Sequence, residues 1–295
     1  MEEFDLLSAL QGLKRNAIRL SFGAEDGIPA GRFGGCPDVP ADFVWPTFET
    51  DTFYDKEVKP RPLSFIAQFD CAALAPMDTE DLLPHKGVLS FFYELGSQTW
   101  GYSPKDAGSA RVYYFADASA LSPAACPADL DEDYRLPAVG FYAHSEAQYP
   151  DFSDFSLAYP KITHPALWME VRGGFDQFSE EFDRAIETLS GKDTKLHHQL
   201  LGWPVIIQNN MTFECELVSR GYYMGNTLKD IPKEAVASAE QNSLSEWILL
   251  FELDSDKFGD YCLDFGDCGS IYFYIRREDL HARRFERAWL ISQCY

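Results

Sequence analysis

Basic residues are scarce in this chain, where 25 Lys and Arg stand against 47 Asp and Glu for a formal net charge of −22. A field of that sign repels phosphate backbones, so we expect no DNA or RNA partner. It would instead attract a basic partner and speed the encounter at low salt. The charge also fits the simpler role of keeping the protein soluble.

Targeting and redox signatures are missing as well. No apolar run approaches the length of a membrane span, and the first residues, MEEFDLLSAL, are acidic where a signal peptide would be basic. We therefore expect a cytoplasmic protein without membrane association and with reduced thiols. No C-x-x-C pair occurs, which excludes the zinc-knuckle and thioredoxin signatures. The seven cysteines are Cys36, Cys71, Cys126, Cys215, Cys262, Cys268 and Cys294.

The usual catalytic motifs are absent too. The sequence has no G-x-S-x-G elbow, no P-loop and no G-x-G-x-x-G, so acyl transfer and nucleotide binding lack their common scaffolds. There is no H-E-x-x-H, and the adjacent His197 and His198 cannot easily reach one metal together. For His198 we expect a hydrogen bond to a loop carbonyl. The sequence thus predicts no catalytic residue, no metal and no cofactor.

What the chain does contain is ample core-building material, because 46% of its residues are hydrophobic and 15% are aromatic. Alternating or continuous apolar runs predict strands, and apolar residues at helical spacing predict helices. We expect an α+β fold of mixed, mostly antiparallel sheets with flanking helices. Predicted strands cover 17–22, 63–70, 87–95, 110–116, 139–145, 247–254 and 270–275. Predicted helices cover 2–17, 176–190, 211–219, 234–241 and 278–289.

Two parts of the chain echo each other. WILLFELD (247–254), a loop and GSIYFYI (269–275) resemble LSFIAQFD (63–70), a loop and GVLSFFY (87–93). Each copy has a Gly-x-Pro upstream, at 35–37 and at 202–204. This pattern predicts internal duplication, with one domain over 1–295 built of two pseudo-repeats at about 18–145 and 176–280.

The same segments carry a family resemblance. GGCPDVPADFVWP, PLSFIAQFD, LPHKGVLSFFY, HQLLGWPVIIQNNM with FECELVS, EWILLFELDSD and GDCGSIYFYI, in this order, resemble the YwqG-like family. The resemblance runs from about residue 31 to about residue 280. It implies a bacterial protein with a mixed, internally duplicated α+β fold, and it implies no established chemistry.

The stretch GRFGGCPDVPADFVWP (31–46) is rich in glycine and proline. Because a Gly-x-Pro recurs in the second copy, we interpret the stretch as architecture rather than as a catalytic loop. Trp45 is expected to be a largely buried anchor, and Cys36 a packed, free and unreactive thiol.

The loop DSDKFGDYCLDFGDCG (254–269) begins like a calcium loop, with Asp254 and Asp256 at the first ligand positions. Phe258 and Phe265 then stand where oxygen ligands are needed, so we predict no stoichiometric calcium site. We expect an acidic loop between strands, in which Asp254 and Asp267 cap turns.

Three hypotheses for function follow. The first is a non-catalytic protein-interaction protein for a basic partner, and a specific version of it is an immunity-type protein that masks a basic toxin. It rests on net charge and on acidic clusters mixed with aromatics at 78–83, 129–134 and 149–155. The second is a hydrolase-type enzyme with a cleft between the pseudo-repeats and a buried carboxylate pair such as Asp254 with Asp267. The third is a small-ligand or sugar-binding module. Candidate binding residues across these hypotheses are Trp45, Trp100, His198, Trp203, Asp254, Asp256 and Asp267.

Overall fold

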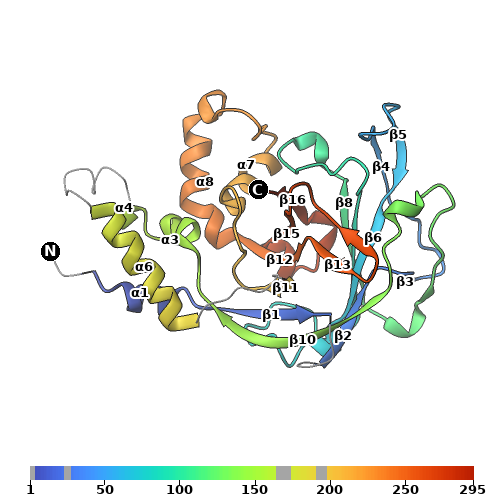
Figure 1. Ribbon diagram of the computed structural model, residues 1–295, viewed down its shortest axis with the longest axis horizontal. Coiled ribbons are helices and arrows are strands. Elements are labelled where there is room, and N and C mark those ends of the chain that lie inside the picture. The colour runs from blue at the N-terminus through green and yellow to red at the C-terminus, as the bar shows by residue number, and fades with distance from the viewer. Residues whose placement is uncertain (1–3, 23–27, 164–173, 191–197) are drawn as a thin grey trace.

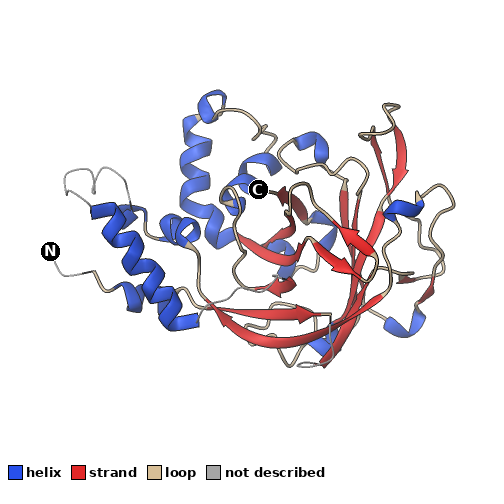
Figure 2. Cartoon of the chain, viewed as in Figure 1, coloured by secondary structure: helices blue, strands red, loops and turns tan. Residues whose placement is uncertain are grey.

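A computed structural model describes residues 4–22, 28–163, 174–190 and 198–295 (Figure 1). Within these residues the fold is α+β, as predicted, with one large antiparallel sheet and helices gathered beside it (Figure 2). The sheet has ten strands in the order β16-β15-β12-β11-β1-β10-β2-β6-β7-β8. None of the helices in these ranges combines the length and apolar character needed to cross a bilayer.

The strands of the large sheet are β1 (Arg15–Ser21), β2 (Ile28–Phe33), β6 (Ser64–Asp70), β7 (Val88–Tyr93), β8 (Ala110–Phe115), β10 (Val139–Gln148), β11 (His198–Leu201), β12 (Trp247–Asp254), β15 (Ser270–Arg276) and β16 (Trp289–Gln293). Three small pairs are β3 (Asp38–Val39) with β9 (Ser122–Pro123), β4 (Thr47–Thr50) with β5 (Lys59–Pro62), and β13 (Asp256–Phe258) with β14 (Tyr261–Leu263). The helices are α1 (Leu6–Gly12), α2 (Cys71–Leu74), α3 (Phe152–Ala158), α4 (Pro160–Thr163), α6 (Gly174–Ser190), α7 (Met211–Ser219), α8 (Lys233–Glu246) and α9 (Arg277–His281). Single turns of 3₁₀ helix are η1 (Pro104–Asp106), η2 (Ala118–Ala120), η3 (Glu132–Tyr134), η4 (Leu228–Asp230) and η5 (Phe285–Arg287).

The large sheet curls so that its two ends face each other across an aromatic core. Phe91 of β7 lies 4.9 Å from Phe251 of β12 and 5.1 Å from Phe273 of β15, measured between ring centroids. All three rings are fully buried. The gap between the outer strands β8 and β16 is bridged by backbone, since Ser292 of β16 donates to the carbonyl of Trp100 at 3.0 Å. The sheet is therefore nearly closed.

The strand order is symmetric about the contact between β1 and β10. On one side β2, β6, β7 and β8 follow in order, and on the other side β11, β12, β15 and β16 do. The pairing of β6 with β7 skips Ile66, and the pairing of β12 with β15 skips Leu250. These two residues occupy the same position in the two echoing sequences, so the same irregularity occurs at equivalent points.

Equivalent hydrogen bonds also occur on both sides. The Gln68 side chain accepts from the backbone of Asp38 at 3.1 Å, and Glu252 accepts from that of Val205 at 3.1 Å. In each case the donor residue directly follows the Gly-x-Pro. The glycine of each Gly-x-Pro and the residue before it, 34–35 and 201–202, have positive φ. Burial, followed by the charge of Asp254, raises the pKa of Glu252 well above its usual value, which favours the uncharged acid at the position that corresponds to Gln68.

We propose on these grounds that the halves are related units. The expected boundaries at 18–145 and 176–280 stay predictions; in the structure β16 of the sheet lies beyond residue 280, and α6 takes no part in the sheet. Instead α6 packs its Phe178 and Phe182 with Leu10 of α1 and Phe155 of α3 in a separate apolar cluster (Figure 1).

Several elements differ from expectation. The helix predicted over 2–17 ends at Gly12, because Arg15 begins a strand that pairs with both β10 and β11. The helix predicted over 278–289 stops at His281, since Arg283 has φ of 56°, outside the helical region. A missed strand, β16, follows and forms one edge of the sheet. The connection 47–62 contains the β4–β5 hairpin.

Candidate functional site

A surface cavity of about 700 Å³ lies between the β4–β5 hairpin and the segment 129–134. We call it the acidic groove. The hairpin, a separate two-stranded sheet, projects beyond the large sheet (Figure 1) and forms one wall of the groove. The residues that line the groove are Thr52, Tyr54, Asp55, Lys59, Pro60, Arg61, Pro62, Glu94, Asp129, Leu130, Asp131, Asp133 and Tyr134.

The hairpin holds both cations of the groove, and two carboxylates pair with them, since Lys59 Nζ also lies 3.5 Å from Glu57 Oε2. Lys59 Nζ lies 2.7 Å and Arg61 Nη2 lies 3.0 Å from Asp55 Oδ2. Hydrogen bonds from these two side chains hold the pKa of Asp55 far below its usual range. Arg61 also donates to the carbonyl of Thr50 at 3.0 Å, which ties the two strands of the hairpin together. This wall is rigidly connected and is close to neutral by itself.

The opposite wall carries unpaired negative charge. Asp129, Asp131 and Asp133 are all exposed, and Asp131 accepts from the backbone of Asp133 at 3.1 Å to begin η3. In the described part of the chain, neither the Asp129 nor the Asp133 side chain forms an ion pair or hydrogen bond. Arg135 points back into this wall and donates to the carbonyl of Leu130, which fixes the loop. The groove therefore keeps an excess of negative charge along one side.

A buried carboxylate and several aromatic rings complete the groove. Glu94 is only 3% exposed and accepts from the backbone of Gly96 at 3.1 Å and of Ser97 at 2.7 Å. Burial, followed by the charge of Glu94, raises the pKa of Tyr134. At the mouth, Tyr54 is 87% exposed. Carboxylates beside aromatic faces are a suitable environment for an ammonium or guanidinium group.

The three tryptophans that were candidates for a ligand site differ in burial and in the residues that surround them. Trp203 is buried, donates through Nε1 to the carbonyl of Leu13 at 2.8 Å and stacks beneath Arg15. Trp45 is partly buried against Phe92, with ring centroids 5.4 Å apart, and donates through Nε1 to the carbonyl of Leu63 at 2.8 Å. Trp100 is 55% exposed beside β16. No contact joins any two of them among the described residues, so they do not form one sugar platform.

His198 and two of the predicted aspartates do meet. His198 Nε2 lies 3.2 Å from Asp256 Oδ2, and its Nδ1 accepts from the backbone of Asp254 at 3.3 Å. The expected bond to a loop carbonyl is therefore wrong. Asp254 also accepts from Ser270 at 2.7 Å, which orients β15 as predicted. These contacts secure β11 to β12 and to the β13–β14 hairpin.

Asp267 behaves differently from the prediction. It is exposed, and of its atoms only the backbone carbonyl makes a described hydrogen bond, to the amide of Tyr295 at 3.2 Å. It is therefore neither a turn cap nor half of a buried pair with Asp254. Within the described ranges no group of three or more His, Cys, Asp or Glu is placed to hold a metal ion.

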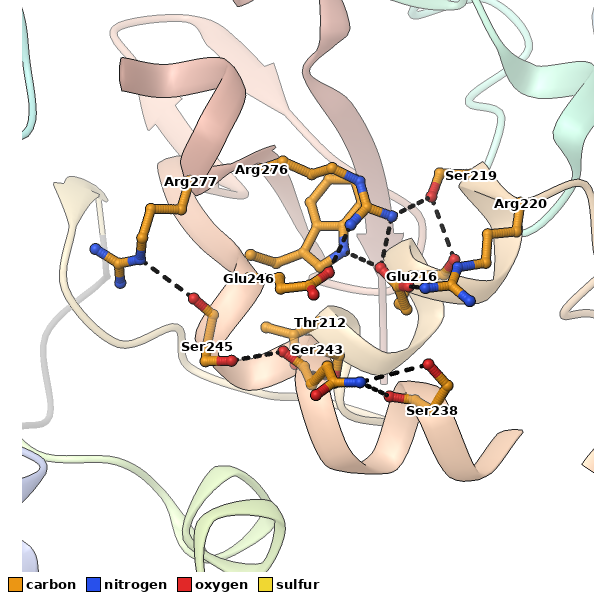
Figure 3. Close-up of polar contacts among 12 residues, drawn as sticks. Thr212, Glu216, Ser219, Arg220, Ser238, Ser243, Ser245, Glu246, Arg276 and Arg277 are labelled. Carbon is orange, nitrogen blue, oxygen red and sulfur yellow. Dashed lines mark hydrogen bonds and ion pairs between the residues drawn. The ribbon is translucent and has the colours of Figure 1, made fainter. Parts of the chain in front are cut away.

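A second charged cluster lies on the other side of the molecule and is structural. Glu216 of α7 is fully buried, accepts from Trp247 Nε1 at 2.9 Å and from Arg276 Nη2 at 2.6 Å, and pairs with Arg220 (Figure 3). Arg276 reaches Glu246 at 2.8 Å with its other nitrogen. The cluster fastens α7 and α8 to β12 and β15 of the sheet.

The hairpin wall was missed in the sequence, whereas the opposite wall lies in the acidic and aromatic stretch 129–134.

Comparison with known families gives one match for this chain. A family model described as a domain of unknown function (DUF1963) matches residues 31–294. No curated protein matches the sequence.

Proposed function

Because the chain belongs to the DUF1963 family, whose function is unknown, we propose from the acidic groove that it binds a basic segment of another protein without catalysis. The observation that carries this proposal is the asymmetry of the groove. One wall has its charges paired, and the other presents Asp129 and Asp133 with no described partner. A lysine or arginine from outside would supply the missing positive charge.

The surroundings support a peptide-like occupant. Tyr54 and Tyr134 can contact the stem and the charged head of a long basic side chain. The net charge of −22 adds a long-range attraction for any basic partner. An immunity-type role, in which a basic toxin is masked, is the narrower form of this proposal. We also propose that the chain is a YwqG-like member of the family and that it resides in the cytoplasm.

The test uses a fluorescently labelled hexa-arginine peptide and measures its fluorescence anisotropy during titration with the full chain. We expect saturable binding that weakens as salt is raised, because exposed charges are screened. Hexa-glutamate peptide of the same length should not bind. Replacing Asp129, Asp131 and Asp133 together by Asn should weaken binding by roughly tenfold, since each partly exposed ion pair contributes about 0.2–1 kcal/mol.

A matched variant separates the groove from the overall charge. The triple substitution Glu180→Gln, Glu181→Gln and Asp183→Asn on the exposed side of α6 changes the net charge by the same amount. It should change the affinity by less than about twofold, because α6 lies at the opposite end of the molecule from the hairpin wall (Figure 1) and salt screens exposed charges. Equal losses in the two variants would mean that only the overall field acts, and would refute a groove site.

A further inference from the structure

Two cysteines lie at the neck of the loop that forms the acidic wall. The amide of Ala124 donates to the carbonyl of Pro37 at 2.9 Å, next to the β3–β9 pair. The amide of Gly35 donates to the carbonyl of Leu136 at 2.9 Å. Residues 125–135 therefore leave and return to the chain at the same short segment, 35–37.

Cys36 stands between these two attachment points, and Cys126 lies two residues beyond Ala124 at the start of the loop. The register of the β3–β9 pair, continued by the Ala124–Pro37 hydrogen bond, brings the backbones around the two cysteines side by side. Cys36 is exposed, so the earlier expectation of a packed thiol is wrong, while Cys126 is half-buried. Burial, followed by the neighbouring Cys36, raises the pKa of the Cys126 thiol.

We propose that Cys36 and Cys126 are a redox modification site that forms a reversible disulfide by exchange with a low-molecular-weight disulfide such as oxidised glutathione. The placement meets the first requirement for such a bond, because the backbones that carry the two cysteines run side by side. Among the remaining cysteines, Cys71 and Cys215 are fully buried in the core and cannot react with a disulfide in solution.

The exchange is balanced in two steps. The exposed Cys36 thiolate attacks one sulfur of oxidised glutathione, and one glutathione leaves with a proton as a thiol. The Cys126 thiolate then attacks the Cys36 sulfur of this mixed disulfide, and the second glutathione leaves as a thiol. The protein loses two protons and two electrons, and the small disulfide gains them. Reduced glutathione in excess reverses both steps.

The bond would close the neck of the 125–135 loop covalently. At present this neck is held by two backbone hydrogen bonds and by the two-residue β3–β9 pair. Closing a loop restricts its open conformations, so the oxidised loop should be cut by proteases more slowly. The inference concerns this loop alone and does not depend on what the groove binds.

The experiment incubates the folded full chain with oxidised and reduced glutathione at several ratios and maps its peptides by mass spectrometry without reduction. We expect a cross-linked peptide pair joining Cys36 to Cys126, and a roughly tenfold fall in maleimide labelling of Cys36 that dithiothreitol reverses. In Cys126→Ser, glutathione should remain attached to Cys36, because no second thiol can displace it. Cys262→Ser and Cys268→Ser, which remove other exposed thiols, should leave the cross-link unchanged.

Glutathione adducts on Cys36 in the wild type without a cross-link would overturn the proposal, and so would a cross-link from Cys36 to any other cysteine. Both outcomes are read from the wild-type chain, so they do not depend on whether a serine variant folds.

Discussion

Replacing the buried Glu216 by alanine is the sharpest test of how the helical layer is held to the sheet. The substitution leaves Trp247 Nε1, Arg276 and Arg220 without their shared acceptor. Removing one partner of a buried pair typically costs about 3–5 kcal/mol. Here the side chains of Arg276 and Arg220 are 22% and 41% exposed, so water can take over part of their solvation. We therefore expect the lower end, about 3 kcal/mol in the free energy of unfolding.

In a protein of this size, a loss of 1 kcal/mol in the free energy of unfolding lowers the melting temperature by about 2–4 °C. The melting temperature should therefore fall by roughly 6–12 °C. Thermal melts followed by circular dichroism measure this directly. The matched control is Glu246→Ala, because Glu246 binds the same Arg276 at 2.8 Å but its side chain is 44% exposed. That loss should be about 0.2–1 kcal/mol. Equal destabilisation by the two substitutions would refute the reasoning from burial.

Two further predictions concern buried positions. Burial, followed by the charge of Asp151, raises the pKa of Asp154 to about 7, so the folded state prefers the protonated acid and loses stability as the pH rises from about 4 through 7. Asp154→Asn should therefore reduce the difference between melting temperatures measured at about pH 5 and about pH 8, and an unchanged difference would contradict this. A side chain at Gly31 would place its Cβ 2.1 Å from the carbonyl oxygen of Gln68, whereas one at Gly12 would have nothing within 4 Å. Urea unfolding should show that Gly31→Ala costs about 1–3 kcal/mol and Gly12→Ala less than about 0.5 kcal/mol, and similar costs would show that the close approach is not rigid.

The sequence predicted the strands whose patterns are long and apolar. The nearly continuous apolar run 87–95 predicted a strand covered on both faces, and β7 is buried almost throughout, while the mostly alternating run 63–70 forms β6. The helix 211–219 was also predicted, with Asn210 capping its first turn. The strand 289–293 was missed because its five residues follow a helical-looking stretch, and only pairing with β15 distinguishes it. Short edge strands depend on their neighbours for their identity.

The candidate site was predictable only in part. The acids at 129–134 are evident in the sequence as a mixed acidic and aromatic cluster. Their partner wall is not, because 47–62 becomes a hairpin only through long-range contacts such as Arg61 to the carbonyl of Thr50. Asp254 and Asp267 look alike in the sequence, yet one orients a strand and the other faces solvent. Exposure depends on the tertiary fold, which a local pattern does not contain.

The position of β1 at the centre of the sheet has a consequence for the order in which the chain can fold during synthesis. Residues 15–148 contain six adjacent strands, β1, β10, β2, β6, β7 and β8, which can assemble before the remainder emerges. One edge of β1 then stays unpaired until β11 is synthesised. β11 begins at residue 198 and pairs with β1 over only four positions. Until that pairing forms, the early sheet presents an open edge, and nascent chains are most exposed there to pairing with one another.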